Sequence, residues 1–254
     1  MQNTFVTDAI NLKSYNLSEA DKIIVMYSKE KGLIKGVAKG VKKTKSKLGA
    51  RMDLLVANTL MLHKGKNLDT ICQAEVVNNF YNTRKDLDKI FYSMYIAEVV
   101  NNFGLEEDPG AEVIYNLLYK ALNTISNANN KIEIMLAVIK FQLKIMHETG
   151  FSIELNSCLN CHQNLENETI FFVPELGGIV CKNCASKIYY RKKQMPYKLK
   201  DFFKQMLLND FDTISDYELK ANDKVCDVSF QLLKEYIEQK SVKKFQSTSI
   251  EQLA

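Results

Sequence analysis

Two pairs of cysteines constrain the fold of this chain more than any other feature. Each pair encloses two residues, and nineteen residues separate the pairs, whose members are Cys158, Cys161, Cys181 and Cys184. Tight turns of this kind place two thiolates on one side of a metal ion, and the spacing is that of structural zinc ribbons. The sequence therefore predicts one structural Zn²⁺ with four sulfur ligands. Such a site leaves no open position for water or substrate, so it would stabilise the fold without catalysing a reaction.

Other interpretations of the cysteines need conditions that the sequence does not supply. The stretch from Cys158 to His162 matches the attachment sequence of a c-type haem, which requires export. A thioredoxin-like dithiol would need a strand-to-helix context and would leave the second pair unexplained. We expect His162 to face solvent, and Cys72 and Cys226 to be small buried hydrophobes. Met1 is followed by polar residues rather than a signal peptide, so we expect a cytoplasmic protein with reduced thiols.

Five runs rich in β-branched and aromatic residues occupy the first 79 residues. Several of them alternate apolar and polar side chains, and glycine-containing turns separate them. The runs are Phe5–Leu12, Lys22–Ser28, Leu33–Gly40, Leu54–His63 and Thr70–Val77. Five short strands predict a small barrel, and the OB-fold is such a barrel that binds oligonucleotides. An SH3-like barrel has almost the same periodicity, so the pattern alone does not separate the two.

From Asn82 onward the apolar residues recur at helical spacing. A first helix is predicted to end at Gly104, and Pro109 is predicted to open a second helix that runs to about Ile125. Further helices are predicted over Lys131–Thr149, 198–209 and 224–240. The predicted fold class is therefore α+β. An OB-fold domain over residues 1–79 precedes an all-helical domain over residues 80–254, with a zinc-ribbon-like insertion at about 151–190.

Positive charge is concentrated in the first third of the chain. Residues 1–79 carry 13 Lys and Arg against 7 Asp and Glu, whereas the rest carries 21 against 23. Seven basic residues fall between positions 35 and 51 without one acidic residue, which favours an exposed loop beside phosphates. A solvated loop without a ligand is the alternative. The candidate nucleic-acid-binding residues are Lys13, Lys35, Lys39, Lys42, Lys43, Lys45, Lys47 and Arg51.

Two weaker features could extend a nucleic-acid path. Tyr15 and Tyr27 could stack on bases or belong to the core. A second basic stretch follows the cysteines and could contact DNA or be an exposed linker; it contains Lys187, Arg191, Lys192 and Lys193.

Motifs for catalysis are missing from the sequence. There is no phosphate-binding Gly-x4-Gly-Lys-Ser/Thr loop, no dinucleotide-binding glycine pattern, and only 3 His. Acidic pairs such as Glu106-Glu107 are interpreted as solvated helix ends. No run of eighteen apolar residues predicts a membrane span. We therefore expect a protein that is not an enzyme and does not bind membranes.

Taken in order along the chain, several short segments resemble the RecO family of bacterial recombination mediators. Each segment alone is unspecific, but their order around the four cysteines resembles that family over essentially the whole length. The segments are Leu12-Lys13-Ser14-Tyr15 with Glu19 and Asp21, Lys31-Gly32-Leu33, Ala38-Lys39-Gly40, Lys42-Lys43-Thr44-Lys45-Ser46, Phe141-Gln142-Leu143-Lys144 with Gly150-Phe151, and Gly177-Gly178-Ile179-Val180-Cys181.

The resemblance implies an OB-fold followed by a helical domain with a zinc-binding insertion. It implies binding of single- and double-stranded DNA, annealing of complementary strands, and a cytoplasmic protein associated with the nucleoid. It also implies partnership with RecR and with the acidic C-terminal tail of the single-stranded DNA-binding protein SSB, so that RecA can load on coated DNA. The family's pocket for that tail lies in the helical domain and is not assigned to residues of this chain.

Two other classes of protein share some of these features. A zinc-ribbon transcription or RNA-binding factor would have the barrel and the metal, although such factors are usually smaller. A nuclease or ligase-like enzyme could use a barrel to bind its substrate, but the nucleotide and metal-carboxylate motifs are absent. Competition between RNA and DNA separates the first class, and incubation of DNA with Mg²⁺ and ATP separates the second.

Overall fold

The computed structural model describes residues 3–166, 169–213 and 216–246. The chain forms two compact units. The N-terminal unit comprises the chain up to Asn127 together with Gln246, and the C-terminal unit comprises Ala128–Phe245. No helix among the described residues is both long enough and apolar enough to cross a membrane.

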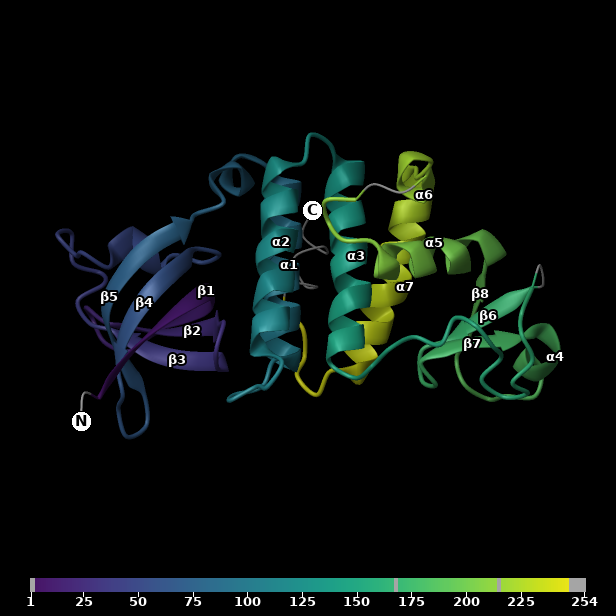
Figure 1. Cartoon of the computed structure of the whole chain (residues 1–254), viewed down its shortest axis with the longest axis horizontal. Coiled ribbons are helices and arrows are strands. Elements are labelled where there is room, and N and C mark those ends of the chain that lie inside the picture. The colour runs from purple at the N-terminus through teal and green to yellow at the C-terminus, as the bar shows by residue number, and fades with distance from the viewer. Residues whose placement is uncertain (1–2, 167–168, 214–215, 247–254) are drawn as a thin grey trace. The chain divides into compact units, whose positions relative to one another are not determined.

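The N-terminal unit contains a closed five-stranded barrel (Figure 1). Its strands are β1 (Thr4–Asn16), β2 (Lys22–Ser28), β3 (Gly32–Ala38), β4 (Ala57–His63) and β5 (Asp69–Asn78). Around the barrel the order is β1, β2, β3, β5, β4, and β4 pairs again with β1. All neighbours are antiparallel except β3 and β5, whose parallel pairing begins at Gly36 and Asp69. This topology is that of the OB-fold, so the predicted barrel is confirmed and the SH3-like alternative is wrong.

Alternation of side chains along the strands fills the barrel. Ile24 and Met26 of β2 point inward and pack with Leu60 and Leu62 of β4. Gly36 on β3 has no room for a side chain, because a Cβ atom there would lie 2.8 Å from Ile71. Successive strand residues point to opposite faces, so the intervening positions face outward.

Two helices complete the N-terminal unit, after a 3₁₀ turn η2 (Tyr81–Lys85). α1 (Leu87–Phe103) begins at Asp86, whose side chain accepts a hydrogen bond from the backbone N–H of Lys89. α2 (Ala111–Asn127) packs on β1, β2 and β3. The prediction that Pro109 opens this helix is wrong. The helix starts at Ala111 because Asp108 forms the turn before it, accepting a bond from the backbone N–H of Gly110.

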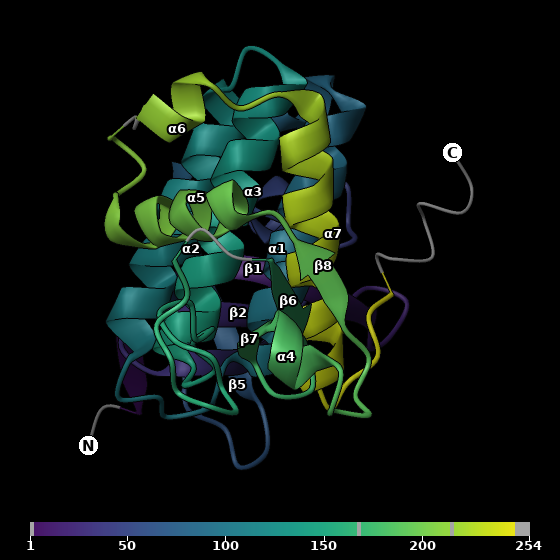
Figure 2. The ribbon, with the colours of Figure 1, turned by 90° about the vertical axis from the view of Figure 1, so that its right-hand side faces the viewer.

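The C-terminal unit is built on three longer helices: α3 (Lys131–Glu148), α5 (Tyr197–Leu208) and α7 (Asp223–Lys240). α3 packs against both α5 and α7, and α5 runs across α3 in Figures 1 and 2. Asn130 and Asn222 cap the first turns of α3 and α7 with side-chain oxygens. Gly150, at a φ of 83°, ends the α3 segment as predicted.

A buried ion pair ties the short helix α6 (Asp216–Leu219) to α3. Lys140 Nζ lies 2.7 Å from Glu218 Oε1, and each side chain is 5% exposed. The same ammonium group donates to the carbonyl oxygens of Asp210 and Thr213. Buried charges are tolerated when they are paired and hydrogen-bonded in this way.

A small sheet carries the cysteine region (Figure 2). β6 (Ile170–Val173) lies between β7 (Gly178–Cys181) and β8 (Lys193–Met195), and the one-turn helix α4 (Lys182–Ala185) follows β7 directly. The predicted insertion is therefore a three-stranded sheet with its own buried residues.

Candidate functional site

The four predicted cysteines meet at one point of the C-terminal unit. Their sulfur atoms all lie within 4.8 Å of one another, and none is part of a disulfide. Tetrahedral coordination with Zn–S bonds of about 2.3 Å requires sulfur atoms about 3.8 Å apart. Cys161 and Cys181 have their sulfur atoms 4.0 Å apart, close to that value. The cluster can therefore hold one metal ion, and its donor set is that of a structural zinc site.

The first cysteine pair lies in a tight turn. The backbone N–H of His162 donates to the carbonyl of Cys158 at 2.8 Å, and His162 has a left-handed φ of 59°. Ser157 and Asn164 pair across the base of the turn. The His162 side chain is exposed, as expected, and is not among the clustered ligands.

The second pair lies where β7 enters α4. The sulfur of Cys181 caps α4 by accepting a bond from the backbone N–H of Cys184 at 3.4 Å. The backbone N–H of Cys181 donates in turn to the sulfur of Cys158, and the Asn160 side chain donates to that of Cys184. Burial raises the pKa of Cys158, but backbone N–H groups of Cys161, Cys181 and Asn160 outweigh it and lower that pKa to about 6. These donors favour the thiolate that a metal requires.

Gly178 lets the two cysteine-bearing segments approach each other. A Cβ atom at this position would lie 2.8 Å from the carbonyl oxygen of Glu154 and 2.9 Å from Leu159. The backbone N–H of Leu159 donates to the carbonyl of Ile179 at 3.0 Å, which ties the first turn to β7. The glycine is therefore required by close packing beside the cluster.

The basic loop between β3 and β4 is folded, although it carries many like charges. Its apolar members Val41, Leu48 and Met52 pack on the barrel core, and the short 3₁₀ helix η1 (Gly49–Met52) ends it. Six predicted basic residues of the loop are exposed: Lys39, Lys42, Lys43, Lys45, Lys47 and Arg51. The loop therefore presents a positively charged surface on a fixed backbone.

Polar bonds fix the beginning of this loop. The Asp21 carboxylate accepts a bond from the backbone N–H of Gly40 at 2.7 Å, and the Lys42 side chain donates to the carbonyl of Ser18. The bond from Gly40 is the main cause of a lowered pKa at Asp21, assisted by Ser18 and by the charges of Lys39 and Lys43. The loop between β1 and β2 is thus bound to the basic loop.

Two buried asparagines fix its end. The side-chain amides of Asn11 and Asn58 both donate to the carbonyl of Arg51, at 2.8 and 2.9 Å. Asn11 also donates to the carbonyl of Asp53. The Arg51 backbone is therefore fixed while its side chain is exposed; the guanidinium donates to the carbonyl of Lys47.

Lys13 and Lys35, the other two candidate residues on the barrel, have different surroundings. Lys13 Nζ lies 5.2 Å from the ring centre of Tyr15, which is 48% exposed, and donates to Gln246. Lys35 is paired with Glu106 at 3.2 Å. Both lysines remain candidates, but neither belongs to the loop.

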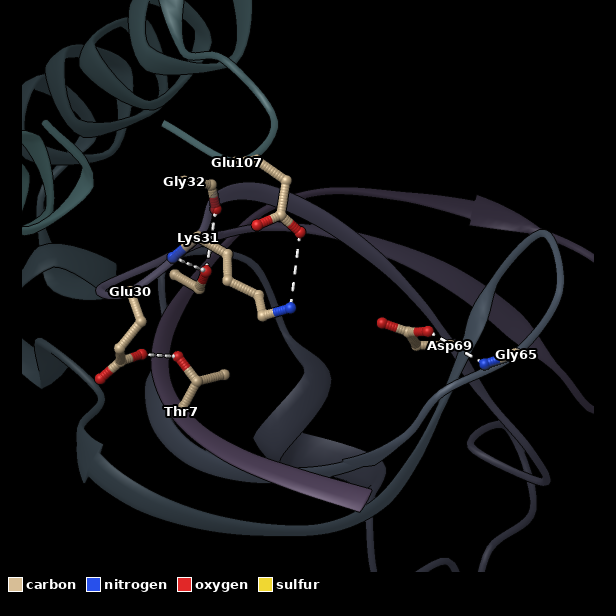
Figure 3. A network of polar contacts seen from close by, with 8 residues as sticks. Thr7, Glu30, Lys31, Gly32, Gly65, Asp69 and Glu107 are labelled. Atoms are coloured by element: carbon tan, nitrogen blue, oxygen red, sulfur yellow. Dashed lines mark hydrogen bonds and ion pairs between the residues drawn. The ribbon is translucent and has the colours of Figure 1, made fainter. Parts of the chain in front are cut away.

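The acidic segment after α1 is solvated, as expected, and also pairs with the barrel. The side chains of Glu106 and Glu107 are 69% and 79% exposed, and they lie within ion-pair distance of Lys35 and Lys31, which the sequence did not predict. Figure 3 shows the Lys31–Glu107 pair beside the bond between Thr7 and Glu30. These pairs neutralise part of the barrel's positive charge away from the basic loop.

Tyr27 is buried rather than available for base stacking, and Cys72 is exposed rather than buried. Tyr27 is fully buried and donates to Asp108 at 2.8 Å, so it is a core residue; burial raises its pKa, and Asp108 adds to that shift. Cys72 is exposed, so its prediction as a buried hydrophobe is wrong: it follows the inward Ile71 on β5 and points outward. Cys226 is buried, as predicted.

The second basic stretch follows α4 and ends in β8. Arg191 and Lys193 both pair with the carboxylate of Glu235, and the Lys192 side chain donates to the carbonyl of Ile188. Lys187 is exposed.

Comparison with known proteins agrees with this architecture. The model described as "Recombination protein O N terminal" matches residues 1–80, and "Recombination protein O C terminal" matches residues 84–249. The "DNA repair protein RecO" of Desulforamulus reducens is 30% identical over 95% of this chain and 91% of its own length. That of Dehalococcoides mccartyi strain 195 is 34% identical over 72% of this chain and 70% of its own length. The chain therefore belongs to the RecO family of recombination and DNA repair proteins.

Proposed function

We propose that this chain is a recombination mediator that binds single- and double-stranded DNA and anneals complementary strands. The barrel of residues 1–79 is the proposed DNA-binding domain. Annealing in this proposal makes and breaks no covalent bond. The observation that carries the proposal is the folded basic loop, whose six exposed cations stand on a backbone fixed at both ends. Such a loop binds phosphates without first having to be ordered, which would otherwise weaken binding.

The binding we propose has little sequence preference. Lysine and arginine contact phosphates, which are the same at every nucleotide, and each neutralised phosphate releases counterions. Tyr15 is exposed and its ring centre lies 5.2 Å from Nζ of the candidate cation Lys13, and we propose that it stacks on a base.

We propose that the metal is Zn²⁺ and that its role is structural. When bound, the ion would cross-link Cys158 and Cys161 to Cys181 and Cys184, which closes the loop between the two pairs. Three of the four thiols are buried, and four sulfur ligands fill a tetrahedral site. This arrangement supports a function without catalysis.

Membership of the family supports the proposed partners. We propose that the chain acts with RecR, binds the acidic C-terminal tail of SSB, and so allows RecA to load on SSB-coated DNA in the cytoplasm. These partners are proposed for the whole protein and are not assigned to individual residues.

The test is annealing of complementary oligonucleotides already coated with the matching SSB, at two salt concentrations. We expect the protein to accelerate annealing, and the acceleration to fade at the higher salt because phosphate contacts dominate. A general DNA binder would be blocked by the coat. Binding to bare DNA without acceleration on coated DNA would contradict the mediator function.

A loop variant identifies the residues responsible. On single strands, log affinity falls as log salt rises. Replacing Lys39, Lys42, Lys43 and Lys45 by Gln should make this dependence less steep by about 3 in slope, since each lost phosphate contact contributes about 0.7. A control variant removes the same charge elsewhere, at four exposed lysines of the C-terminal unit: Lys131, Lys220, Lys224 and Lys244. An equal change of slope in both variants would mean that net charge, rather than the loop, governs binding.

Two further experiments test whether the protein is instead an RNA-binding factor or an enzyme. Preferential displacement of DNA by RNA would favour a zinc-ribbon RNA-binding factor. Cleavage or joining of labelled DNA in Mg²⁺ and ATP would favour an enzyme. We expect neither result.

A further inference from the structure

A segment beside the cysteine cluster repeats the charge pattern of the basic loop. Residues 176–200 contain seven basic side chains and no acidic one. The basic residues are Lys182, Lys187, Arg191, Lys192, Lys193, Lys198 and Lys200. Within this segment stand two neighbouring aromatic residues, Tyr189 and Tyr190, which the proposed function does not use.

The two tyrosines are exposed to an unusual degree. Tyr189 is 105% exposed, the highest value among the large hydrophobic side chains of the described residues, and Tyr190 is 51% exposed. A buried aromatic side chain contributes strongly to stability, so leaving two neighbouring rings in water gives up that contribution. Neither ring packs on another aromatic ring in the described part of the chain.

The backbone that carries these rings is held in place. On one side the backbone N–H of Lys187 donates to the carbonyl of Cys184, which joins the segment to the metal-binding turn. On the other side Lys193 pairs with Glu235 of α7 and lies in β8, which pairs with β6. Lys192 donates across the turn to the carbonyl of Ile188 at 2.9 Å. The rings are therefore presented by a fixed turn.

Cations flank the two rings in the sequence. Lys182 and Lys187 are exposed and have no ionic partner among the described residues. Arg191 and Lys193 share the single carboxylate of Glu235, so they retain one net positive charge. Exposed aromatic rings between cations are the combination that binds single-stranded nucleic acid, where bases stack on rings and cations contact phosphates. Paired bases of a duplex are not available for such stacking.

We propose that the turn of residues 186–192, together with Lys182 of α4, is a second single-stranded DNA site, in which Tyr189 and Tyr190 stack on unpaired bases and Lys182 and Lys187 contact phosphates. The inference rests on the proposed annealing function and deepens it. Annealing brings together two strands, and a site on each unit would let one molecule hold both. The metal site has a structural role here, because Cys184 fixes the start of the turn.

The absence of tryptophan from the chain provides a direct test. In the full-length protein, Tyr189→Trp introduces one indole at the proposed stacking position, and Leu208→Trp introduces one at a 77% exposed position on α5 outside the site. Binding of fluorescently labelled oligo(dT) is followed by anisotropy, and tryptophan emission is read in the same samples. We expect oligo(dT) to quench the indole of the Tyr189→Trp variant but not that of the Leu208→Trp variant. A duplex of equal length should quench the Tyr189→Trp variant much less.

The result separates this site from the proposed function. Oligo(dT) binding by anisotropy without quenching in the Tyr189→Trp variant would overturn the second site and leave the barrel function intact. Absence of any anisotropy change would overturn both. Equal quenching by duplex would overturn a site for unpaired bases.

A second set of variants tests affinity. In the protein with Lys39, Lys42, Lys43 and Lys45 replaced by Gln, Tyr189→Ala with Tyr190→Ala should weaken oligo(dT) binding at least about fivefold. Replacement of both residues by Phe keeps the rings and should leave binding within about twofold, since stacking does not need the hydroxyl. Loss of binding in the Phe variant, or no loss in the Ala variant, would overturn stacking.

Discussion

Removing one partner of the buried Lys140–Glu218 pair should destabilise the C-terminal unit strongly. In Lys140→Met the Glu218 carboxylate, whose side chain is 5% exposed, loses the ammonium group 2.7 Å away. The carbonyls of Asp210 and Thr213 lose their bonds to the same group, at 2.9 and 3.2 Å. Breaking a buried pair in this way costs about 3–5 kcal/mol.

A surface pair provides the matched control. Arg191 and Glu235, in the same C-terminal unit, approach to 3.1 Å, but their side chains are 72% and 24% exposed. Pairs of this kind contribute about 0–1 kcal/mol, because water competes for both charges. Arg191→Met should therefore change the free energy of unfolding by less than about 1 kcal/mol.

Cys226 reports on the unfolding of the C-terminal unit alone. It is 0% exposed on α7, and burial, assisted by Asp223 and Asp227, raises its pKa to about 11. An alkylating reagent reaches this thiol only when the unit opens, and mass spectrometry of its peptide gives the rate. When opening and closing are fast, that rate follows the equilibrium population of the open form. A loss of 3–5 kcal/mol should raise it by roughly 10²- to 10³·⁵-fold, because about 1.4 kcal/mol corresponds to a factor of ten.

A double variant distinguishes the loss of the ion pair from the loss of packing. Lys140→Met with Glu218→Leu removes both charges and should recover much of the stability that Lys140→Met loses. A labelling rate for Lys140→Met within about tenfold of that for Arg191→Met would refute the argument that burial makes this pair critical.

Three further outcomes are expected. Freshly purified, untagged protein should contain about one zinc per chain by elemental analysis, and less than about half a zinc per chain would contradict the proposed site. Cys184→Ala should destabilise the C-terminal unit, while the barrel keeps its thermal transition. Gly178→Ala should cost about 1–3 kcal/mol in urea unfolding, because its Cβ meets Glu154 backbone, whereas Gly49→Ala, with open space, should not. The pKa of Asp21 is lowered in the folded state, so the stabilisation by its carboxylate is present above the unfolded pKa of about 3.9 and is lost as pH falls. The protection of the Gly40 amide, measured against the intrinsic exchange rate at the same pH, should therefore fall below about pH 4, and Asp21→Asn should remove that dependence.

The barrel was largely predictable because its signals are local. β2 spans Lys22–Ser28 as predicted, since alternation and a glycine turn define both ends. β1 runs on to Asn16 instead of ending at Leu12, because a register shift between Asn11 and Lys13 interrupts the alternation. β4 begins at Ala57 rather than Leu54, since Leu55 has a left-handed φ of 63°.

In the candidate sites, too, features with a local sequence signal were predictable and contacts between distant residues were not. The cysteine ligands were predictable because each pair sits in one short turn, and spacing alone reports that geometry. The Lys35–Glu106 pair joins residues 71 positions apart, and no local pattern in one sequence reports such a contact. The outward position of Cys72 was available from its neighbour, because Ile71 is apolar and successive residues of β5 face opposite ways.

Both acid-free stretches must form fixed loops although their charges repel one another. In the basic loop, buried Val41 and Met52 alternate with exposed cations, so apolar burial opposes the repulsion. In the segment beside the cysteines, the Glu235 carboxylate reduces the repulsion by pairing with both Arg191 and Lys193. The backbone bond from Lys187 to Cys184 holds the start of the turn. If phosphates bind as proposed, they relieve the repulsion left in each segment, so the energy of crowding the charges would add to the affinity for DNA. Affinity and fold stability would then oppose each other, which accounts for anchors that are buried apolar residues or a shared carboxylate rather than one acidic partner for each lysine.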